Sequence, residues 1–255
     1  MAVDASVKRA RFRALHQQGC FILPNPWDPG GAQRLEKIGF KALATTGAGY
    51  AWSLGRQDGQ LTRDETLDHL RTLCAATDLP VNADFETGYA HDPEGLSENV
   101  LLAVQTGVAG LSIEDRNERD LLEIGAAAEK VRVARRAIDR SGEDVLLIGR
   151  SEGYFIGKPN LEATISRLIA YSEAGADCLY APGVYNLDDI ARIVSAVHPK
   201  PVNVMIVGPG LSVANLAAVG VRRVSVGASL AVAALKGFDA AAQMLLTEGT
   251  LPARD

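Results

Sequence analysis

Two short apolar segments of the sequence each end at acidic residues. Residues 81–83 lead into Asp84 and, two positions later, Glu86, while residues 111–113 lead into Glu114. The apolar runs predict strands, and the composition between them predicts a helix, so we expect two parallel strands in one sheet. Asp84, Glu86 and Glu114 then meet at one edge of that sheet. Three carboxylates in one place repel one another, and a hard divalent cation between them is the simplest explanation.

Further polar residues follow other predicted strands. They are Thr46, Gly47 and Ala48 after the second strand, Arg150 and Glu152 after the fifth, and Asn203 on the seventh. These positions hold carboxylates and a guanidinium group but no histidine or cysteine, which favours Mg²⁺ or Mn²⁺ over Zn²⁺. The planar fork of Arg150 suits bidentate recognition of a substrate carboxylate. Consecutive amides at 46–48 can form a nest for an oxygen anion.

Each of these residues also has a structural explanation. The acidic side chains can pair with arginines such as Arg116, and Arg150 can neutralise Glu152 or Glu114. Residues 46–49 can be no more than a flexible turn. Carboxylates at the ends of barrel strands are poorly explained by stability alone, which favours the metal site over a salt-bridge network. The choice between an anion nest and a turn stays open.

Eight apolar segments, each followed by a predicted helix, must position these side chains. The predicted strands lie at residues 21–23, 42–45, 81–84, 111–114, 145–149, 178–181, 202–206 and 223–226. Strands that are apolar on both faces are typical of a parallel sheet covered by helices. Eight such units in 255 residues predict an α/β protein with a (β/α)8 TIM barrel fold. An open doubly wound sheet is the alternative, although no G-x-G-x-x-G motif follows the first strand.

Local signals bound several of the predicted helices. Asp28 precedes Pro29 and is placed to cap a helix that Gly39 closes. The capping box at 62–65 begins another helix. Between these two helices, residues 46–61 are expected to form a long Gly-rich loop.

Composition limits the classes of function. With 255 residues, 47% of them hydrophobic, the chain fits one domain over residues 1–255. A net charge of −5 without a basic run gives no support for a nucleic-acid or membrane partner, so a small molecule is expected. Cys20, Cys74 and Cys178 are too widely spaced for a disulfide framework or a zinc site, which fits a cytoplasmic protein. No apolar run is expected to reach the roughly 18 residues of a membrane span.

Five ordered motifs carry a family resemblance. They are Thr45-Thr46-Gly47, Arg56-Gln57-Asp58-Gly59, Asp84-Phe85-Glu86-Thr87-Gly88-Tyr89, Ser112-Ile113-Glu114-Asp115 and Gly149-Arg150-Ser151-Glu152. Together they resemble the isocitrate lyase/phosphoenolpyruvate mutase superfamily over most of the chain. The resemblance implies a (β/α)8 barrel of the phosphoenolpyruvate/pyruvate type that binds Mg²⁺ and takes 2-oxo or 2-hydroxy carboxylates. It also implies a homo-oligomer, a dimer or tetramer, with the eighth helix exchanged between subunits.

The same resemblance implies a role for each site residue. Asp84 and Glu86 would hold the metal directly or through water, and Glu114 mainly through water. Asp58 would lie over the metal, and Arg150 would engage the substrate carboxylate or the developing oxyanion. The backbone of Thr46, Gly47 and Ala48 would cradle an oxygen atom. Asn203 is a further candidate for substrate binding.

The sequence also departs from the superfamily pattern. Lyases of the superfamily carry a Lys-Lys/Arg-Cys-Gly-His loop after the fourth strand, whereas residues 116–123 contain no cysteine. Phosphonate-processing members use an asparagine-bearing loop and a histidine after the sixth strand, and this chain has Ala181-Pro182-Gly183 there. Both departures make the specialised reactions less expected than the chemistry that the members share.

That shared chemistry is stabilisation of a pyruvate-like enolate. Decarboxylation of a β-keto acid such as oxaloacetate needs no dedicated acid, because water can protonate the enolate. A carbon–carbon lyase acting on a 2-hydroxy dicarboxylate is a close second, with Tyr50, Tyr89, Tyr154 or His91 as candidate proton carriers. The alternatives are phosphorus–carbon chemistry and a non-catalytic relative that only binds 2-oxo acids.

Overall fold

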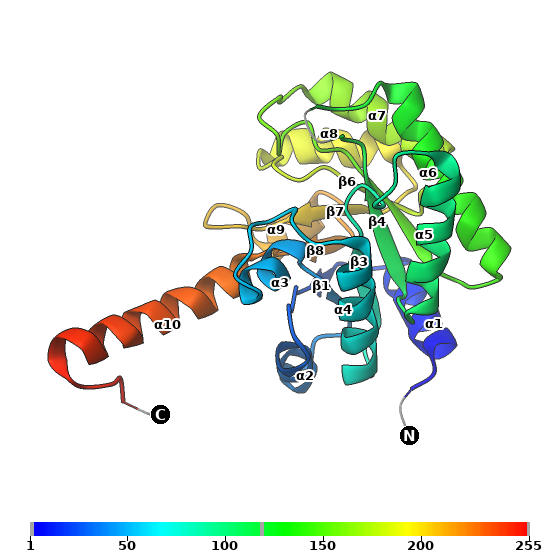
Figure 1. Cartoon of the computed structure of the whole chain (residues 1–255). Coiled ribbons are helices and arrows are strands. Elements are labelled where there is room, and N and C mark those ends of the chain that lie inside the picture. The colour runs from blue at the N-terminus through cyan, green and yellow to red at the C-terminus, as the bar shows by residue number, and fades with distance from the viewer. Residues whose placement is uncertain (1–2, 118–119, 254–255) are drawn as a thin grey trace.

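The computed structural model describes residues 3–117 and 120–253. Its centre is one sheet of eight parallel strands in the order β1-β8-β7-β6-β5-β4-β3-β2 (Figure 1). The strands are β1 (Phe21–Leu23), β2 (Leu43–Ala44), β3 (Val81–Asp84), β4 (Gly110–Glu114), β5 (Leu146–Arg150), β6 (Cys178–Tyr180), β7 (Val202–Met205) and β8 (Arg223–Ser225). The two outer strands approach each other, since the amide of Ala44 donates to the carbonyl of Pro24 at 3.0 Å. The predicted (β/α)8 barrel is therefore confirmed.

Ten helices are present in the described part of the chain. They are α1 (Ala5–Leu15), α2 (Pro29–Ile38), α3 (Gly47–Ser53), α4 (Arg63–Ala76), α5 (Pro93–Gln105), α6 (Ile124–Ser141), α7 (Leu161–Glu173), α8 (Leu187–Val197), α9 (Val213–Ala218) and α10 (Ser229–Glu248). Most begin and end within a few residues of the predicted positions. That residues 1–255 make a single domain stays a prediction.

The predicted helix ends agree with the structure. Asp28 accepts a hydrogen bond from the amide of Gly31, and Gly39 closes α2 with a φ of 107°, which favours glycine. Thr62 and Glu65 form the reciprocal capping box of α4. These local signals set the direction in which each helix leaves the barrel.

The predicted loop at 46–61 is wrong in its first half. Residues 47–53 form helix α3, and the side chain of Thr46 accepts a hydrogen bond from the amide of Gly49 at its start. Two of its seven residues are glycines, which have a low helix propensity, so the composition of the segment does not predict a helix. The N-cap at Thr46 and the packing of Gly49 against Ala231 stabilise the helix in spite of this low propensity.

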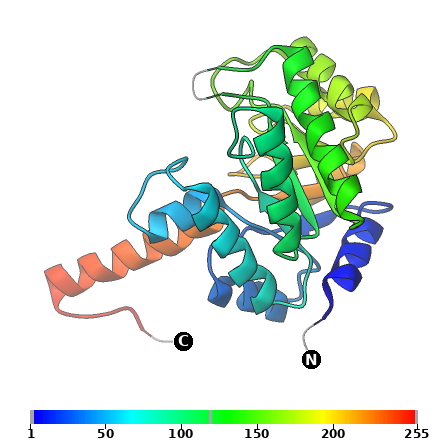
Figure 2. The ribbon, with the colours of Figure 1, turned by 45° about the vertical axis from the view of Figure 1, so that its right-hand side comes forward.

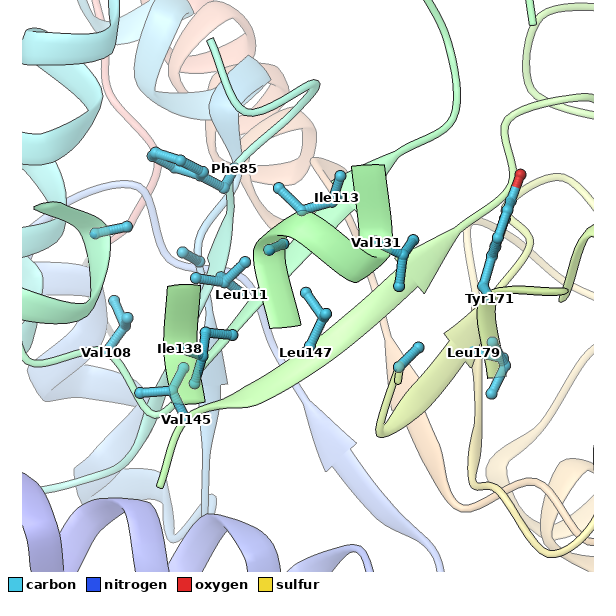
Figure 3. Close-up of a cluster of buried hydrophobic side chains, with 14 of the residues drawn as sticks. Phe85, Val108, Leu111, Ile113, Val131, Ile138, Val145, Leu147, Tyr171 and Leu179 are labelled. Atoms are coloured by element: carbon cyan, nitrogen blue, oxygen red, sulfur yellow. The ribbon is translucent and has the colours of Figure 1, made fainter. Parts of the chain in front are cut away.

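Two apolar layers hold the barrel. Outward-facing side chains of the strands pack against the surrounding helices: Figure 3 shows Leu111 of β4 and Leu147 of β5 in one cluster with Val131 of α6. Inward-facing side chains of β1, β2, β5 and β6 fill part of the barrel interior. Phe12 of α1 is fully buried in this inner cluster, so the N-terminal helix closes the floor of the barrel. The opposite end is left for the polar side chains.

Helix α10 extends away from the barrel (Figures 1 and 2). Only Ala231 of this helix is buried, whereas Phe238 is 71% and Leu246 82% exposed. Contrary to the sequence expectation, α10 is long and apolar enough to cross a membrane, and 6% of its most apolar window is buried. The helix contains the charged residues Lys236 and Asp239, but the alanines and leucines around them keep its mean hydropathy high. Length and composition alone do not place the helix in a membrane.

Candidate active site at the mouth of the barrel

A cavity of about 130 Å³ opens where the strands end. A cavity of about 150 Å³ holds one benzene molecule in an engineered protein, so this space suits a ligand of a few heavy atoms. The predicted residues that line it are Thr46, Ala48, Asp58, Asp84, Glu86, Glu114, Arg150 and Asn203. The structure thus brings together residues that are far apart in the sequence.

Arg150 lies at the centre of this group. Its Nη1 atom is 3.1 Å from Oδ1 of Asp84 and 3.2 Å from Oε1 of Glu114, and its Nε atom donates to Glu152. Burial opposes the charge of Arg150, but the carboxylates of Glu114, Glu152 and Asp84 outweigh burial and raise its pKa well above the ordinary value. The guanidinium therefore keeps its charge while it holds three strand ends in place.

The salt-bridge explanation from the sequence is also visible. Arg116 donates to Glu114 at 2.9 Å and lies 4.0 Å from a carboxylate oxygen of Glu152. Three arginines, Arg116, Arg150 and Arg223, thus line the cavity together with five carboxylates, the fifth being Asp58. The arginines do not balance the acids, which leaves a place for a further cation.

Glu86 is the most unusual of the acids. Its φ of 45° lies in the left-handed region, as does the φ of Tyr89 at 53°. Such strain in non-glycine residues concentrates at functional sites. The Oε1 atom of Glu86 is buried without a hydrogen-bond partner among the described residues. Burial first, and the nearby charge of Asp84 second, raise the pKa of Glu86 to about 7.

The pKa of Asp84 is raised as well. Burial raises the pKa of Asp84, with Glu114 and Asp58 adding to the effect, while Arg150 and the amide of Gly47 oppose it. The backbone of Asp84 is fixed from below, because its amide donates to the hydroxyl of Thr45 at 2.8 Å. The fold therefore holds the Asp84 carboxylate close to Glu114 and Asp58, although these acids repel one another.

Gly47 marks the point where the acids converge. A Cβ atom at this position would lie 3.3 Å from Oε1 of Glu86, 3.9 Å from Oδ1 of Asp58 and 4.0 Å from Oδ2 of Asp84. Its amide donates to Asp84, so one donor of the predicted nest already serves a protein carboxylate. The motif at 46–48 is therefore a helix start that also supports the acidic group.

The residues present fit a divalent cation. No set of three or more His, Cys, Asp or Glu side chains within residues 3–117 and 120–253 is already arranged as a metal site. However, the unpartnered oxygen of Glu86 and the raised pKa values of Asp84 and Glu86 are the features expected of carboxylates that lack their cation. All of the candidate ligands offer hard oxygen atoms.

Glu152 was given only a pairing role by the sequence. Its side chain is fully buried, its Oε2 atom has no hydrogen-bond partner among the described residues although Arg116 lies 4.0 Å away, and burial raises its pKa to about 7. The amide of Glu152 donates to Asp115 at 2.8 Å. Asp115 also accepts from Tyr171 at 2.6 Å and from Arg167 at 3.2 Å, so it anchors the Glu152 segment rather than facing the cavity.

Several lining residues were missed by the sequence reasoning. Asn25, Asn82, Tyr180, Arg223 and Ser225 all face the cavity. For Asn82, Tyr180, Arg223 and Ser225 the signal was a polar residue within a predicted strand, whereas Asn25 follows strand β1 and lies in no strand. Period-2 alternation identifies such a position only once the strand bounds are known.

Two of the candidate proton carriers have partners in the structure. Tyr89 contacts the Thr66 hydroxyl at 2.9 Å and also bonds to Glu86 of the site. Tyr50 is stacked on His69 at 3.8 Å between ring centroids. The 116–123 loop adds Arg116 to the cavity, and its residues Glu118 and Arg119 lie outside the described part of the chain.

Comparisons with known proteins agree with this architecture. The family model described as phosphoenolpyruvate phosphomutase matches residues 12–246. An uncharacterized protein of Mycobacterium tuberculosis is 34% identical over 85% of this chain and 81% of its own length. An oxaloacetate decarboxylase of Pseudomonas paraeruginosa is 30% identical over 89% of this chain and 82% of its own.

A solved structure is closer still. A protein of Burkholderia cenocepacia J2315, provisionally assigned as a lyase or mutase, superposes with a TM-score of 0.94 at 45% identity. The match covers 97% of this chain and 91% of the other. The chain therefore belongs to the phosphoenolpyruvate phosphomutase family, within the isocitrate lyase/phosphoenolpyruvate mutase superfamily.

Proposed function

We propose that this protein is a Mg²⁺-dependent enzyme that acts on 2-oxo or 2-hydroxy carboxylates through a pyruvate-like enolate. The family supports carbon–carbon lyase or mutase chemistry. Within that range, decarboxylation of oxaloacetate is the reaction we favour. The observation that carries the proposal is the position of Arg150, whose guanidinium contacts Asp84 and Glu114 at the edge of the cavity.

Asp84, Glu86 and Glu114 would hold the cation. Mg²⁺ suits their oxygen ligands, and Mn²⁺ is the alternative. When bound, the ion supplies Lewis acidity toward the keto and carboxylate oxygens of a 2-oxo acid. Asp58 approaches the same space from the 54–61 loop and is exposed, so it is free to move over a ligand.

Arg150 would bind the substrate carboxylate and stabilise charge that develops beside it. Its raised pKa keeps it cationic at any working pH, so it attracts a carboxylate even though its Nη1 and Nε atoms already contact Asp84, Glu114 and Glu152. The start of helix α3 would add the backbone donors of Thr46 and Ala48, while the amide of Gly47 already serves Asp84. Together they provide preorganised positive potential where an enolate oxygen forms.

The chemistry needs no protein acid. When the carbon–carbon bond of a β-keto acid breaks, CO₂ leaves and the electron pair becomes the enolate, which then takes a proton from water. The loop at 116–123 has no cysteine, and the cavity is open to solvent. Both features favour decarboxylation over a lyase reaction whose carbanionic product must be protonated by a side chain.

Phosphorus–carbon chemistry is the second candidate, because the matched family model is that of a phosphomutase. A non-catalytic protein that only binds 2-oxo acids is the third. A panel of 2-oxo and 2-hydroxy di- and tricarboxylates together with phosphonopyruvate, each assayed with and without Mg²⁺, distinguishes all three. We expect Mg²⁺-dependent formation of pyruvate from oxaloacetate.

The matched variants are Asp58→Ala and Arg150→Ala, both of which should abolish turnover. Arg132→Ala, on the exposed face of α6, is the control and should leave turnover unchanged. Tight binding of a 2-oxo acid without turnover of any compound would instead identify a binding protein. Turnover of phosphonopyruvate alone would identify the phosphorus–carbon reaction.

We also infer a cytoplasmic homo-oligomer, a dimer or tetramer, in which α10 packs against a second copy. The exposed Leu235, Phe238 and Leu246 support this arrangement, because exposed apolar patches of this kind mark interaction sites. Analytical ultracentrifugation of Phe238→Glu should show smaller species than the wild type. A wild-type protein that sediments as a monomer would contradict the inference.

A further inference from the structure

Arg223 is a buried cation without a counter-ion. The residue is 3% exposed and forms no ion pair with any carboxylate that the structure describes. Among the ionisable groups that act on Arg223 are Cys178 and Tyr180, and burial raises the pKa of both, so both stay neutral. A buried charge of this kind is costly unless something compensates it.

The neighbours of Arg223 are neutral acceptors. Its Nε atom donates to Oδ1 of Asn203 at 2.9 Å, and its Nη1 atom lies 3.3 Å from Oδ1 of Asn82. The same Nη1 atom is 3.5 Å from Nε2 of His16. Burial and the charge of Arg223 lower the pKa of His16 to about 3, so this imidazole is neutral as well.

These contacts fix the direction of two side-chain amides. Because Asn203 and Asn82 each offer a carbonyl oxygen to Arg223, their NH₂ groups must point elsewhere. The NH₂ group of Asn203 donates to Ser225 at 3.0 Å, and that of Asn82 donates to the carbonyl of Ala83 at 3.1 Å. The inner end of the cavity therefore presents the positive charge of Arg223, which the two asparagines hold in place.

Arg223 and Arg150 stand at the two ends of one row of the sheet. Arg150 pairs with Tyr180, Tyr180 with Asn203, and Asn203 with Arg223, across strands β5 to β8. All four side chains line the same cavity. Two cations thus bracket a single space, one at the mouth beside the acids and one at depth.

We propose that Arg223, which Asn82 and Asn203 hold in place, forms an inner anion subsite that takes the distal carboxylate of a dicarboxylate substrate. The substrate's 2-oxo end then lies at Arg150, so this assignment rests on the proposed function and narrows it to dicarboxylates. The distal carboxylate of the ligand then supplies the negative charge that no described carboxylate of the protein gives to Arg223. Monocarboxylates such as pyruvate leave the inner subsite unfilled, which favours release of a product that has lost its second carboxylate.

Isothermal titration with two matched ligands in the presence of Mg²⁺ tests the proposal. Pyruvate has only the 2-oxo end, whereas 3,3-difluorooxaloacetate adds the distal carboxylate and resists cleavage. We expect wild-type protein to bind the dicarboxylate about tenfold or more tightly than pyruvate, as a charge-assisted contact predicts. Arg223→Met should abolish this preference and leave pyruvate binding within about twofold, since only the distal contact is lost.

Two further variants keep the test decisive. Arg223→Lys retains the charge and should keep most of the preference for the dicarboxylate, even if Arg223→Met folds poorly. Arg222→Met alters the neighbouring, partly exposed arginine, which donates to the carbonyl of Gly19, and should bind both ligands like the wild type. Thermal melting with each ligand gives a second readout, because the dicarboxylate should raise the melting temperature of the wild type more than that of Arg223→Met.

The possible results distinguish failure of the Arg223 subsite from failure of the proposed function. Equal loss of both ligands in Arg223→Met, or no loss of either, would show that Arg223 only supports the barrel floor and would overturn the subsite. Equal affinity of the wild type for both ligands would overturn it too. If the wild type bound neither ligand, the proposed function would fail, and the subsite with it.

Discussion

The Nη1 atom of Arg150 lies 3.1 Å from the Oδ1 atom of Asp84. The contact joins strand β5 to strand β3 across β4, and it links the residue expected to bind substrate with a residue expected to bind metal. Both side chains are mostly shielded from solvent, at 12% and 27% exposure. A surface ion pair contributes little, but breaking a shielded one leaves an uncompensated charge.

Replacement of Arg150 by methionine should lower kcat/KM for oxaloacetate by about 100-fold or more, the usual effect of losing a donor to a developing oxyanion. Arg150→Lys keeps the charge but not the fork and should recover only part of the rate. Steady-state kinetics with circular dichroism as a folding check measures both. Full activity of the methionine variant would refute the role of the guanidinium.

Binding of Mg²⁺ should strengthen as the pH rises from 6 to 8. The pKa of Glu86 is raised to about 7, mainly by burial, so the carboxyl group is largely protonated at pH 6 and must lose its proton to bind a cation. We expect affinity about tenfold weaker at pH 6 than at pH 8. Calorimetry in buffers of different ionisation enthalpy counts the proton released. Glu86→Gln should flatten the dependence, and an unchanged slope would exclude Glu86 as its source.

The metal-free protein should become less stable over the same pH range. Glu86 and Glu152 both have native pKa values of about 7, above those of an unfolded chain, so the native state binds more protons between pH 5 and 7. By linkage, the free energy of unfolding then falls as pH rises. Urea titrations in EDTA at pH 5, 6, 7 and 8 measure the fall. Glu152→Gln should remove part of it, and a rise of stability with pH would contradict the assignment.

Replacement of Gly47 by alanine should impair metal binding without unfolding the chain. The added methyl group would stand 3.3 Å from Oε1 of Glu86, inside the space where the acids converge. We expect affinity for Mg²⁺ to fall by about tenfold, since a displaced ligand contact costs about 1.4 kcal/mol. Gly125→Ala, at a position with nothing within 4 Å, is the matched control. Equal metal affinity in both variants would exclude crowding at Gly47.

Much of the fold could be predicted from the sequence because its signals are local. The apolar strands and the caps at Asp28, Gly39 and Thr62 each depend on a few neighbouring residues. The carboxylates at strand ends converge simply because parallel strands end at the same side of a barrel. Asp84, Glu86 and Glu114 line one cavity, as this rule predicts.

What the sequence missed depends on contacts between distant segments. Helix α3 needs its docking against Ala231, 180 residues or so further along, which no local propensity contains. The left-handed φ of Glu86 follows from the turn that carries it and not from its residue type. Arg223 begins the last predicted strand, and only the closed barrel brings its side chain to Asn203. The metal, the roles of the site residues and the oligomeric state remain predictions.

Strand β1 pairs with strand β8, so Phe21 lies opposite Arg223, and nearby Arg222 holds the carbonyl of Gly19 from 203 positions away. A ribosome adds about 5 to 20 residues per second, so the first strand waits roughly 10 to 40 seconds for its neighbour. During that time the edge of β1 that will pair with β8 has no partner, and the apolar interior of the barrel is exposed to solvent. A nascent chain that stops before β8 should consequently be held by chaperones or aggregate, and the enzyme should reach its folded state only after synthesis has nearly finished.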